Sequence, residues 1–221
     1  MRSRFRSAGP LAVAAGIAVL LTGCGSDDWS QPHAEPTAVG TLGPGFSDPA
    51  APPAPEATIT PAPGSWAGIH PSKGYRVVLL TAGTDGPTTA LVTAVRAWAE
   101  AEDVDLRTVV AGHDPVPGIN QAVALHPDLI VSAGNDLIDP LAVVTASHLD
   151  QQFLAVGAEV AEPTHNVTAV DWSGASFRGE GLGASSSYDA GSFTGARCAA
   201  AVRAGVAAVL TDLTGIVVWL A

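Results

Sequence analysis

Apolar residues in the second part of the chain alternate between short continuous runs and runs with a helical period. Residues 75–82 form a near-continuous apolar run of strand length, and residues 88–102 then place Leu91, Val95 and Trp98 on one helical face. Strands alternating with helices indicate an α/β fold with one open parallel sheet and helices on both faces, as in a flavodoxin-like lobe. The further predicted elements are strand 104–111, short helix 119–125, strand 129–132, helix 141–149, strands 153–156 and 167–172, an alanine-rich helix 191–210 and a last strand 215–220.

Small and polar residues follow the predicted strands. In open α/β sheets ligands bind beyond the carboxyl ends of the strands, so these residues predict a binding rim for a small polar molecule. Taken singly, their glycines can form turns and their polar side chains can cap helices. The candidate ligand-binding residues are Asp85, Asn135, Asp136, Asp171 and Trp172, with carboxylates accepting ligand hydroxyls or amines and Trp172 offering a stacking face.

Residues 24–73 differ in composition and periodicity from residues 74–221, which form the predicted α/β lobe. The stretch from 25 to 72 holds ten of the 17 prolines and shows no period of 2 or 3.6. Such a segment buries too little apolar surface to offset its ordering entropy, which predicts a disordered, acidic, partly polyproline tether. Trp29 and Trp66 interrupt it, and isolated linker tryptophans more often have no identifiable role than dock on a neighbour.

Residues 1–23 have the features of an export signal. Arg2, Arg4 and Arg6 precede an apolar or glycine run at residues 11–21 that is shorter than the roughly 20 residues a membrane span needs. The sequence Leu-Thr-Gly-Cys at residues 21–24 resembles the bacterial lipobox, in which the cysteine sulfur receives diacylglycerol and cleavage precedes the cysteine. The resemblance implies a lipoprotein signal peptide and an acylated Cys24 that anchors the chain to the extracytoplasmic face of the cell membrane; the alternative is an ordinary secretory signal with an incidental cysteine.

Charge and cysteine content narrow the possible partners and cofactors. The full chain carries a net charge of −11, and loss of the three signal arginines makes it three units more negative, so we expect no nucleic-acid binding. With Cys24 acylated, Cys198 has no intramolecular disulfide partner and is expected to be a buried helix thiol. No cysteine metal site can form, and no cofactor is expected.

Short segments of the lobe resemble the basic membrane protein type of substrate-binding lipoproteins, which have the periplasmic-binding-protein type I fold. They are strand 77–82, the stretches 126–134, 152–157 and 166–172, and the Ala-Gly of residues 190–191 followed by Ala-Ala at 199–200. The resemblance implies the first lobe of that fold, a small-molecule ligand and an ABC-type permease as partner.

Two departures limit what this resemblance implies. The family's Asp-x-Ser-Phe-Asn stretch is replaced by residues 83–89, which contain no aromatic side chain, so purine-nucleoside binding is not carried over. The family also has two lobes that close on the ligand, whereas we expect one lobe here, so a homodimer or another protein would supply the second wall.

Motifs for catalysis are weak, and we expect no enzymatic activity. Ser132 lacks the first glycine of a nucleophile elbow, and neither a phosphate-binding loop nor a His-Glu-x2-His motif is present. Residues 179–184 fit Gly-x-Gly-x-x-Ala by letter but are better explained as a loop. His113 and Asp114 leave a hydrolase as a third possibility.

The predicted function is the solute-binding component of an uptake system, and the alternative is an envelope lipoprotein that acts as a scaffold without binding ligand.

Overall fold

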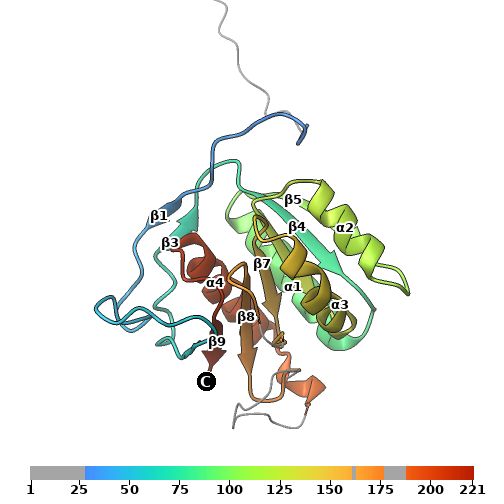
Figure 1. Ribbon diagram of the computed structural model, residues 1–221. Coiled ribbons are helices and arrows are strands. Elements are labelled where there is room, and N and C mark those ends of the chain that lie inside the picture. The colour runs from blue at the N-terminus through green and yellow to red at the C-terminus, as the bar shows by residue number, and fades with distance from the viewer. Residues whose placement is uncertain (1–27, 161–162, 177–187) are drawn as a thin grey trace, which may run out of the picture.

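The computed structural model of the protein describes residues 28–160, 163–176 and 188–221. Its centre is a seven-stranded sheet of order β2-β9-β8-β7-β6-β4-β5, in which every neighbouring pair is parallel (Figure 1). The strands are β2 (Thr58–Ile59), β4 (Arg76–Thr81), β5 (Asp105–Val110), β6 (Leu129–Ala133), β7 (Phe153–Val156), β8 (Val167–Trp172) and β9 (Val217–Leu220).

Helices cover both faces of the sheet. One face packs against α1 (Gly86–Ala101) and α4 (Gly195–Leu210), and the other against α2 (Val116–Ala124) and α3 (Ile138–Val144). All six residues of β4 are buried, as expected for a central strand covered on both sides. The predicted α/β class with an open parallel sheet is therefore confirmed.

The predicted elements of the lobe are confirmed, with small shifts at their ends. Helix α1 begins at Gly86 because the carboxylate of Asp85 accepts the Thr88 N–H and caps the helix. Helix α4 begins at Gly195, after the Thr194 cap, and the residues before it form the 3₁₀ turn η3 (Ala190–Ser192). Two further 3₁₀ turns, η1 (Asn135–Leu137) and η2 (Thr145–Ser147), flank α3.

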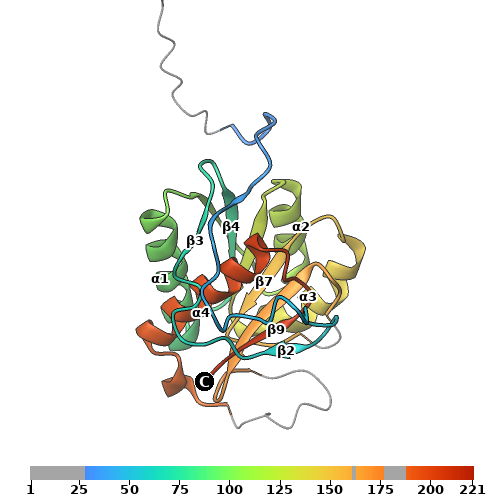
Figure 2. The same cartoon turned by 90° about the vertical axis from the view of Figure 1, so that its left-hand side faces the viewer.

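The structure corrects the prediction of a disordered tether for residues 28–73, which we call the strap. The strap lies along the lobe and forms the antiparallel pair β1 (Ala38–Gly40) and β3 (Ile69–Pro71) (Figure 2). It also supplies β2, whose Thr58 and Ile59 pair in parallel with Val217 and Val218 of β9 at one edge of the sheet. The predicted signal peptide and Cys24 lie outside the described residues.

Helix α4 explains why the strap is ordered. The helix is rich in alanine, and nine of its 16 residues are buried. Its apolar surface is wider than the face that packs on the sheet, and the strap covers part of the remainder. Phe46, Trp66 and Ile69 of the strap belong to the same apolar cluster as α4. Three large side chains spaced through a proline-rich segment thus supply the buried area that composition alone does not reveal.

We expect Phe46→Ala to lower the free energy of unfolding by about 3–5 kcal/mol, because the substitution leaves a cavity where the ring is buried. Phe46 is only 2% exposed. Chemical denaturation measures the change, and Val39→Ala is the control, since Val39 lies in the same strap but is 52% exposed. Equal stabilities of the two variants would contradict a packed strap.

Candidate functional site

The strand order creates a switch point at the carboxyl end of β4. The chain leaves β4 for β5 on one side and later returns with β6 on the other side, so the loops after β4 and β6 diverge there. They come into close contact at the base of this crevice: a Cβ on Gly134 would lie 2.3 Å from the carbonyl oxygen of Ala82, and the φ of Gly134 is +129°. Only glycine fits at this position.

The larger pocket of this crevice has a volume of about 610 Å³. That volume is within the range of roughly 300–1,000 Å³ that is typical of small-molecule sites. Its lining contains two carboxylates and one amide but neither lysine nor arginine. The lining residues are Ala82, Gly83, Ala111, Gly112, His113, Pro115, Asn135, Asp136 and Asp139.

A second, much smaller cavity lies beside it, with a volume of about 20 Å³, enough for about one water molecule. Asn135 lines both cavities and so connects the two parts of the crevice. The other lining residues are Asp85, Pro87, Thr88, Leu91, Gly134, Val156, Gly157, Ala158, Ser176, Tyr188 and Phe193.

The structure brings together Asn135 and Asp136, two of the predicted site residues. Both lie in η1, directly after β6, and both are exposed to the larger pocket. Parallel strands end at the same edge of the sheet, which is why the residues that follow β6 meet those that follow β4 and β5. Their role in binding stays a prediction.

Asp85 lines the small cavity, but its carboxylate already serves helix α1. One oxygen accepts the Thr88 N–H at 2.9 Å and the other accepts the Thr88 hydroxyl at 2.8 Å. Partial burial alone would raise the pKa of Asp85, but the two hydrogen bonds from Thr88 outweigh it and hold the pKa below its usual value. The capping interpretation is therefore confirmed for Asp85.

Trp172 does not offer the stacking face that the sequence predicts. The side chain is 1% exposed, its indole N–H donates to Ser192 Oγ at 3.0 Å, and its ring meets Phe193 edge-on at 5.0 Å. The side chain of Trp172 points into the α1/α4 face of the sheet because β8 alternates between faces. The aromatic residues that do line the small cavity are Phe193 and the half-exposed Tyr188.

Asp171 is also buried rather than displayed on the rim. Its side chain is 1% exposed, and one of its oxygens accepts the Trp172 N–H at 2.9 Å. Burial raises its pKa to about 7, although the hydrogen bond from Trp172 opposes the shift. Glu159, which follows β7, is 5% exposed, and burial together with the nearby Asp171 carboxylate raises its pKa to about 7 as well. The two carboxyl groups thus form a buried acidic pair next to the crevice.

Sequence reasoning missed three residues that line the crevice: Asp139 lines the larger pocket, whereas Tyr188 and Phe193 line the smaller one. His113, which the sequence offers as a candidate acid or base, also lines the larger pocket. The two aromatic residues follow the carboxyl end of β8 in the sequence. Because the segments after the strands lie at the edge that carries the crevice, this position could have predicted that both residues line it. Asp139 lies one turn of chain beyond Asp136, a spacing that puts both carboxylates on one side of a helical segment.

Asp114 and Cys198, two further residues considered in the sequence, have structural roles. Asp114 accepts the Val116 N–H at 3.2 Å and so takes part in the turn that starts α2. Cys198 is a free and fully buried thiol, and burial raises its pKa to about 11, as expected for a structural cysteine.

Within residues 28–160, 163–176 and 188–221, no group of three or more histidine, cysteine or acidic side chains is arranged to hold a metal ion. No helix in these same ranges is long and apolar enough to cross a bilayer.

Comparisons with known proteins find distant structural similarity. No protein-family model and no curated protein matches the chain. An ABC-transporter solute-binding protein from Aeropyrum pernix K1 matches with a TM-score of 0.38 and 20% identity, over 45% of this chain and 29% of that one. One from Conexibacter woesei DSM 14684 matches with a TM-score of 0.37 and 22% identity, over 44% of this chain and 35% of that one. A fragment of a candidate lipoprotein from Peptoclostridium difficile 630 matches with a TM-score of 0.40 and 16% identity, over 63% of this chain and 99% of that one.

The matched part of the chain therefore spans about a third of the two solute-binding proteins. At TM-scores of this size we base no functional conclusion on these similarities.

We expect Asp171→Asn to stabilise the protein at pH 8 by about 1–3 kcal/mol, since an amide keeps the shape of the side chain without a buried charge. The folded-state pKa of Asp171 is raised to about 7 from 3.8, so its contribution to stability is complete below pH 4 and is lost as the pH rises through 7. The free energy of unfolding should therefore fall less steeply between pH 4 and pH 8 in the variant than in the wild type.

Denaturant titrations at several pH values measure this slope. Asp150→Asn is the control, because Asp150 is an exposed carboxylate at the opposite edge of the sheet. Parallel stability curves for the wild type and Asp171→Asn would contradict a raised pKa at Asp171.

Proposed function

We propose that this chain is a lipid-anchored extracytoplasmic protein whose α/β lobe binds a small polar ligand in the crevice between β4 and β6. The observation that carries the proposal is the pocket of about 610 Å³ at the topological switch point of the sheet. Open parallel sheets bind ligands at this place because two adjacent loops diverge there and leave a space above the strand ends.

The lining of the pocket favours a ligand with hydroxyl or amine groups. Asp136 and Asp139 can accept hydrogen bonds, Asn135 can both donate and accept, and exposed backbone at Gly83 and Gly112 permits close approach. No lysine or arginine lines the pocket to balance an anionic ligand, and the chain is acidic overall. Phosphorylated and carboxylate ligands are therefore disfavoured.

A role as the solute-binding component of an ABC-type uptake system is the finer form of this proposal. It rests on the sequence resemblance to the basic membrane protein type of substrate-binding lipoproteins and on the parallel lobe with its binding crevice. One lobe provides half of a closing cleft, so a second copy or another protein would complete the site. Binding rather than catalysis is proposed, and it is supported by Asp114, a catalytic candidate of the sequence, which accepts the Val116 N–H in the turn before α2.

The lipid anchor is proposed at Cys24. It is supported by the cationic start, the short apolar core and the Leu-Thr-Gly-Cys sequence, which occur in the order that lipoprotein signals require. Two or three acyl chains at one cysteine would give durable attachment, whereas one chain binds a membrane only marginally.

A scaffold function without ligand binding is the second candidate, and three residues favour it. Asp85 is engaged in helix capping, and Asp171 and Trp172 are buried, so most of the predicted rim serves the fold. A lobe of this kind would use its surface for contact with other envelope proteins and would leave the crevice unused.

We expect a hydroxylated or amine-bearing ligand to raise the thermal unfolding midpoint of the protein, because a ligand that binds only the folded state stabilises it by RT ln(1 + [L]/Kd). Thermal-shift screening with sugars, nucleosides and amino acids, with organic acids as the disfavoured class, identifies the ligand. Calorimetry should then show that Asn135→Ala combined with Asp136→Ala weakens binding by about tenfold or more, since two hydrogen bonds are lost.

Asp150→Asn again serves as the control and should bind as the wild type does. If none of these ligand classes shifts the unfolding midpoint of either the monomer or a dimer, ligand binding is wrong and the scaffold function is favoured.

We expect Cys24→Ser to release the protein from the membrane fraction and to abolish the incorporation of labelled palmitate, because the sulfur that carries the lipid is lost. Cys198→Ser is the matched control, since this thiol is fully buried and should stay unmodified. Palmitate labelling that persists in the Cys24→Ser variant would contradict the proposed anchor.

A further inference from the structure

We propose that the first part of the strap, residues 28–37, holds the amino-terminal edge of the sheet next to the membrane, so that the crevice opens away from the bilayer. The inference rests on the lipid attachment proposed for Cys24, and it adds an orientation that attachment alone does not provide. We call residues 28–37 the docking segment.

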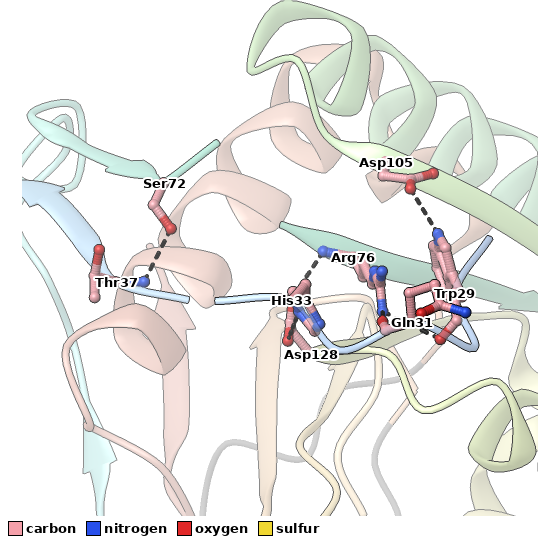
Figure 3. Close-up of polar contacts among 8 residues, drawn as sticks. All are labelled: Trp29, Gln31, His33, Thr37, Ser72, Arg76, Asp105 and Asp128. Carbon is pink, nitrogen blue, oxygen red and sulfur yellow. Dashed lines mark hydrogen bonds and ion pairs between the residues drawn. The ribbon is translucent and has the colours of Figure 1, made fainter. Parts of the chain in front are cut away.

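Trp29 is the main anchor of the docking segment (Figure 3). Its ring is 6% exposed, and its indole N–H donates to Asp105 Oδ2 at 2.6 Å. The guanidinium groups of Arg107 and Arg76 lie 4.3 Å and 5.7 Å from the ring centroid. A buried tryptophan with a satisfied N–H and two adjacent guanidinium groups is held in one orientation.

Arg76 fixes the backbone of the docking segment to the start of β4. Its side chain is 7% exposed and donates to the carbonyl oxygens of Trp29 at 3.2 Å and Gln31 at 3.1 Å (Figure 3). A buried guanidinium that lost these two acceptors would be left with unsatisfied donors, which makes detachment of the segment costly.

Two more contacts extend the attachment. His33 Nε2 lies 2.8 Å from Asp128 Oδ1. The other carboxylate oxygen of Asp128 accepts the backbone N–H of Arg76 at 2.8 Å. Further along, the Thr37 N–H donates to Ser72 Oγ at 3.1 Å, next to the β1/β3 pair. The docking segment is thus attached at four residues between Trp29 and Thr37.

The three residues that hold Trp29, Gln31 and His33 by hydrogen bonds lie at the amino-terminal edge of the sheet. Arg76 and Asp105 are the first residues of β4 and β5, and Asp128 directly precedes β6. In Figure 1 the strap enters at the top of the lobe, and the arrows of β8 and β9 point downward to the opposite edge. The crevice lies at that opposite edge, since its loops follow the carboxyl ends of β4, β5 and β6.

The length of chain between anchor and lobe limits how far the lobe can move. Cys24 precedes Trp29 by five residues, which span at most about 18 Å when fully extended. A six-residue strand such as β8 is about 20 Å long. A lobe held at its amino-terminal edge by so short a connection cannot turn its opposite edge to the same membrane while the docking segment stays attached.

The orientation decides how the crevice meets its ligand. A crevice that faces away from the lipid is open to solutes arriving from the outside and to a soluble partner that supplies the second wall. A fifty-residue disordered tether, by contrast, would let the lobe rotate and would leave both edges equally close to the membrane on average.

Energy transfer from a fluorophore on the lobe to acceptor-labelled lipid headgroups tests the orientation. The full chain is expressed in bacteria in a Cys198→Ala background, and the mass of the Cys24 peptide reports whether lipid is attached. The protein is then placed in vesicles of phosphatidylethanolamine and phosphatidylglycerol. Donors are attached through Asp150→Cys, which precedes β7 at the amino-terminal edge, or Ser173→Cys, which follows β8 at the carboxyl edge; both residues are exposed.

We expect transfer from the donor at position 150 to exceed that from position 173 by about twofold or more, because the two sites differ in height by roughly one strand length. In Trp29→Ala combined with His33→Ala, which loosens the docking segment, the two values should become similar. His70→Ala is the matched control, since it removes a strap histidine whose Nδ1 lies 2.8 Å from Glu102, outside the docking segment. The control should keep the difference.

Equal transfer from both positions in the wild type, or stronger transfer from position 173, would overturn the proposal. So would a difference that persists when the docking segment is loosened, with folding of that variant verified by its unfolding midpoint. If the Cys24 peptide carries no lipid, the proposed anchor fails separately, and coupling the same sulfur to a maleimide lipid in the vesicles still tests the orientation.

Discussion

The pairing of β4 with β5 on one side and β6 on the other organises both ends of the molecule. At its carboxyl end, β4 marks the point where the chain changes direction, and the loops after β4 and β6 diverge to form the crevice. At its amino end, the buried guanidinium of Arg76 holds the backbone of the docking segment. The crevice therefore lies at the carboxyl end of β4, and the docking segment is attached at its amino end.

The strap and helix α4 depend on each other. An alanine-rich helix with a wide apolar surface needs cover on its outer side, and a proline-rich segment needs a surface on which its few large side chains can be buried. Phe46, Trp66 and Ile69 meet both needs, and β2 extends the sheet at the same edge. The proposed orientation at the membrane depends instead on the docking segment, which precedes these contacts and keeps the amino-terminal edge of the lobe close to its proposed anchor.

The candidate site divides into residues that are buried or cap a helix and residues that are exposed to the larger pocket. Asp85 caps α1, whereas Asp171 and Trp172 are buried, and the Asp171–Glu159 pair stores an electrostatic cost that grows as the pH rises. Asn135 and Asp136 remain exposed to the larger pocket. A polar residue after a strand thus predicts the correct edge of the sheet, but its exposure depends on which face it occupies and on whether a helix start follows.

The sequence by itself determined most strands and helices of residues 74–221, the α/β class with an open parallel sheet, and the edge of the sheet at which the candidate crevice lies. These features depend on local periodicity and on the rule that parallel strands end together. Only the tertiary structure decided the place of the strap and the burial of Asp171 and Trp172. The strap has no periodicity of its own, and its order arises from contacts such as Trp29 with Asp105 and Phe46 with the α4 cluster, which lie far apart in sequence. Burial at a strand end likewise depends on what packs against it, as Phe193 and Ser192 do against Trp172.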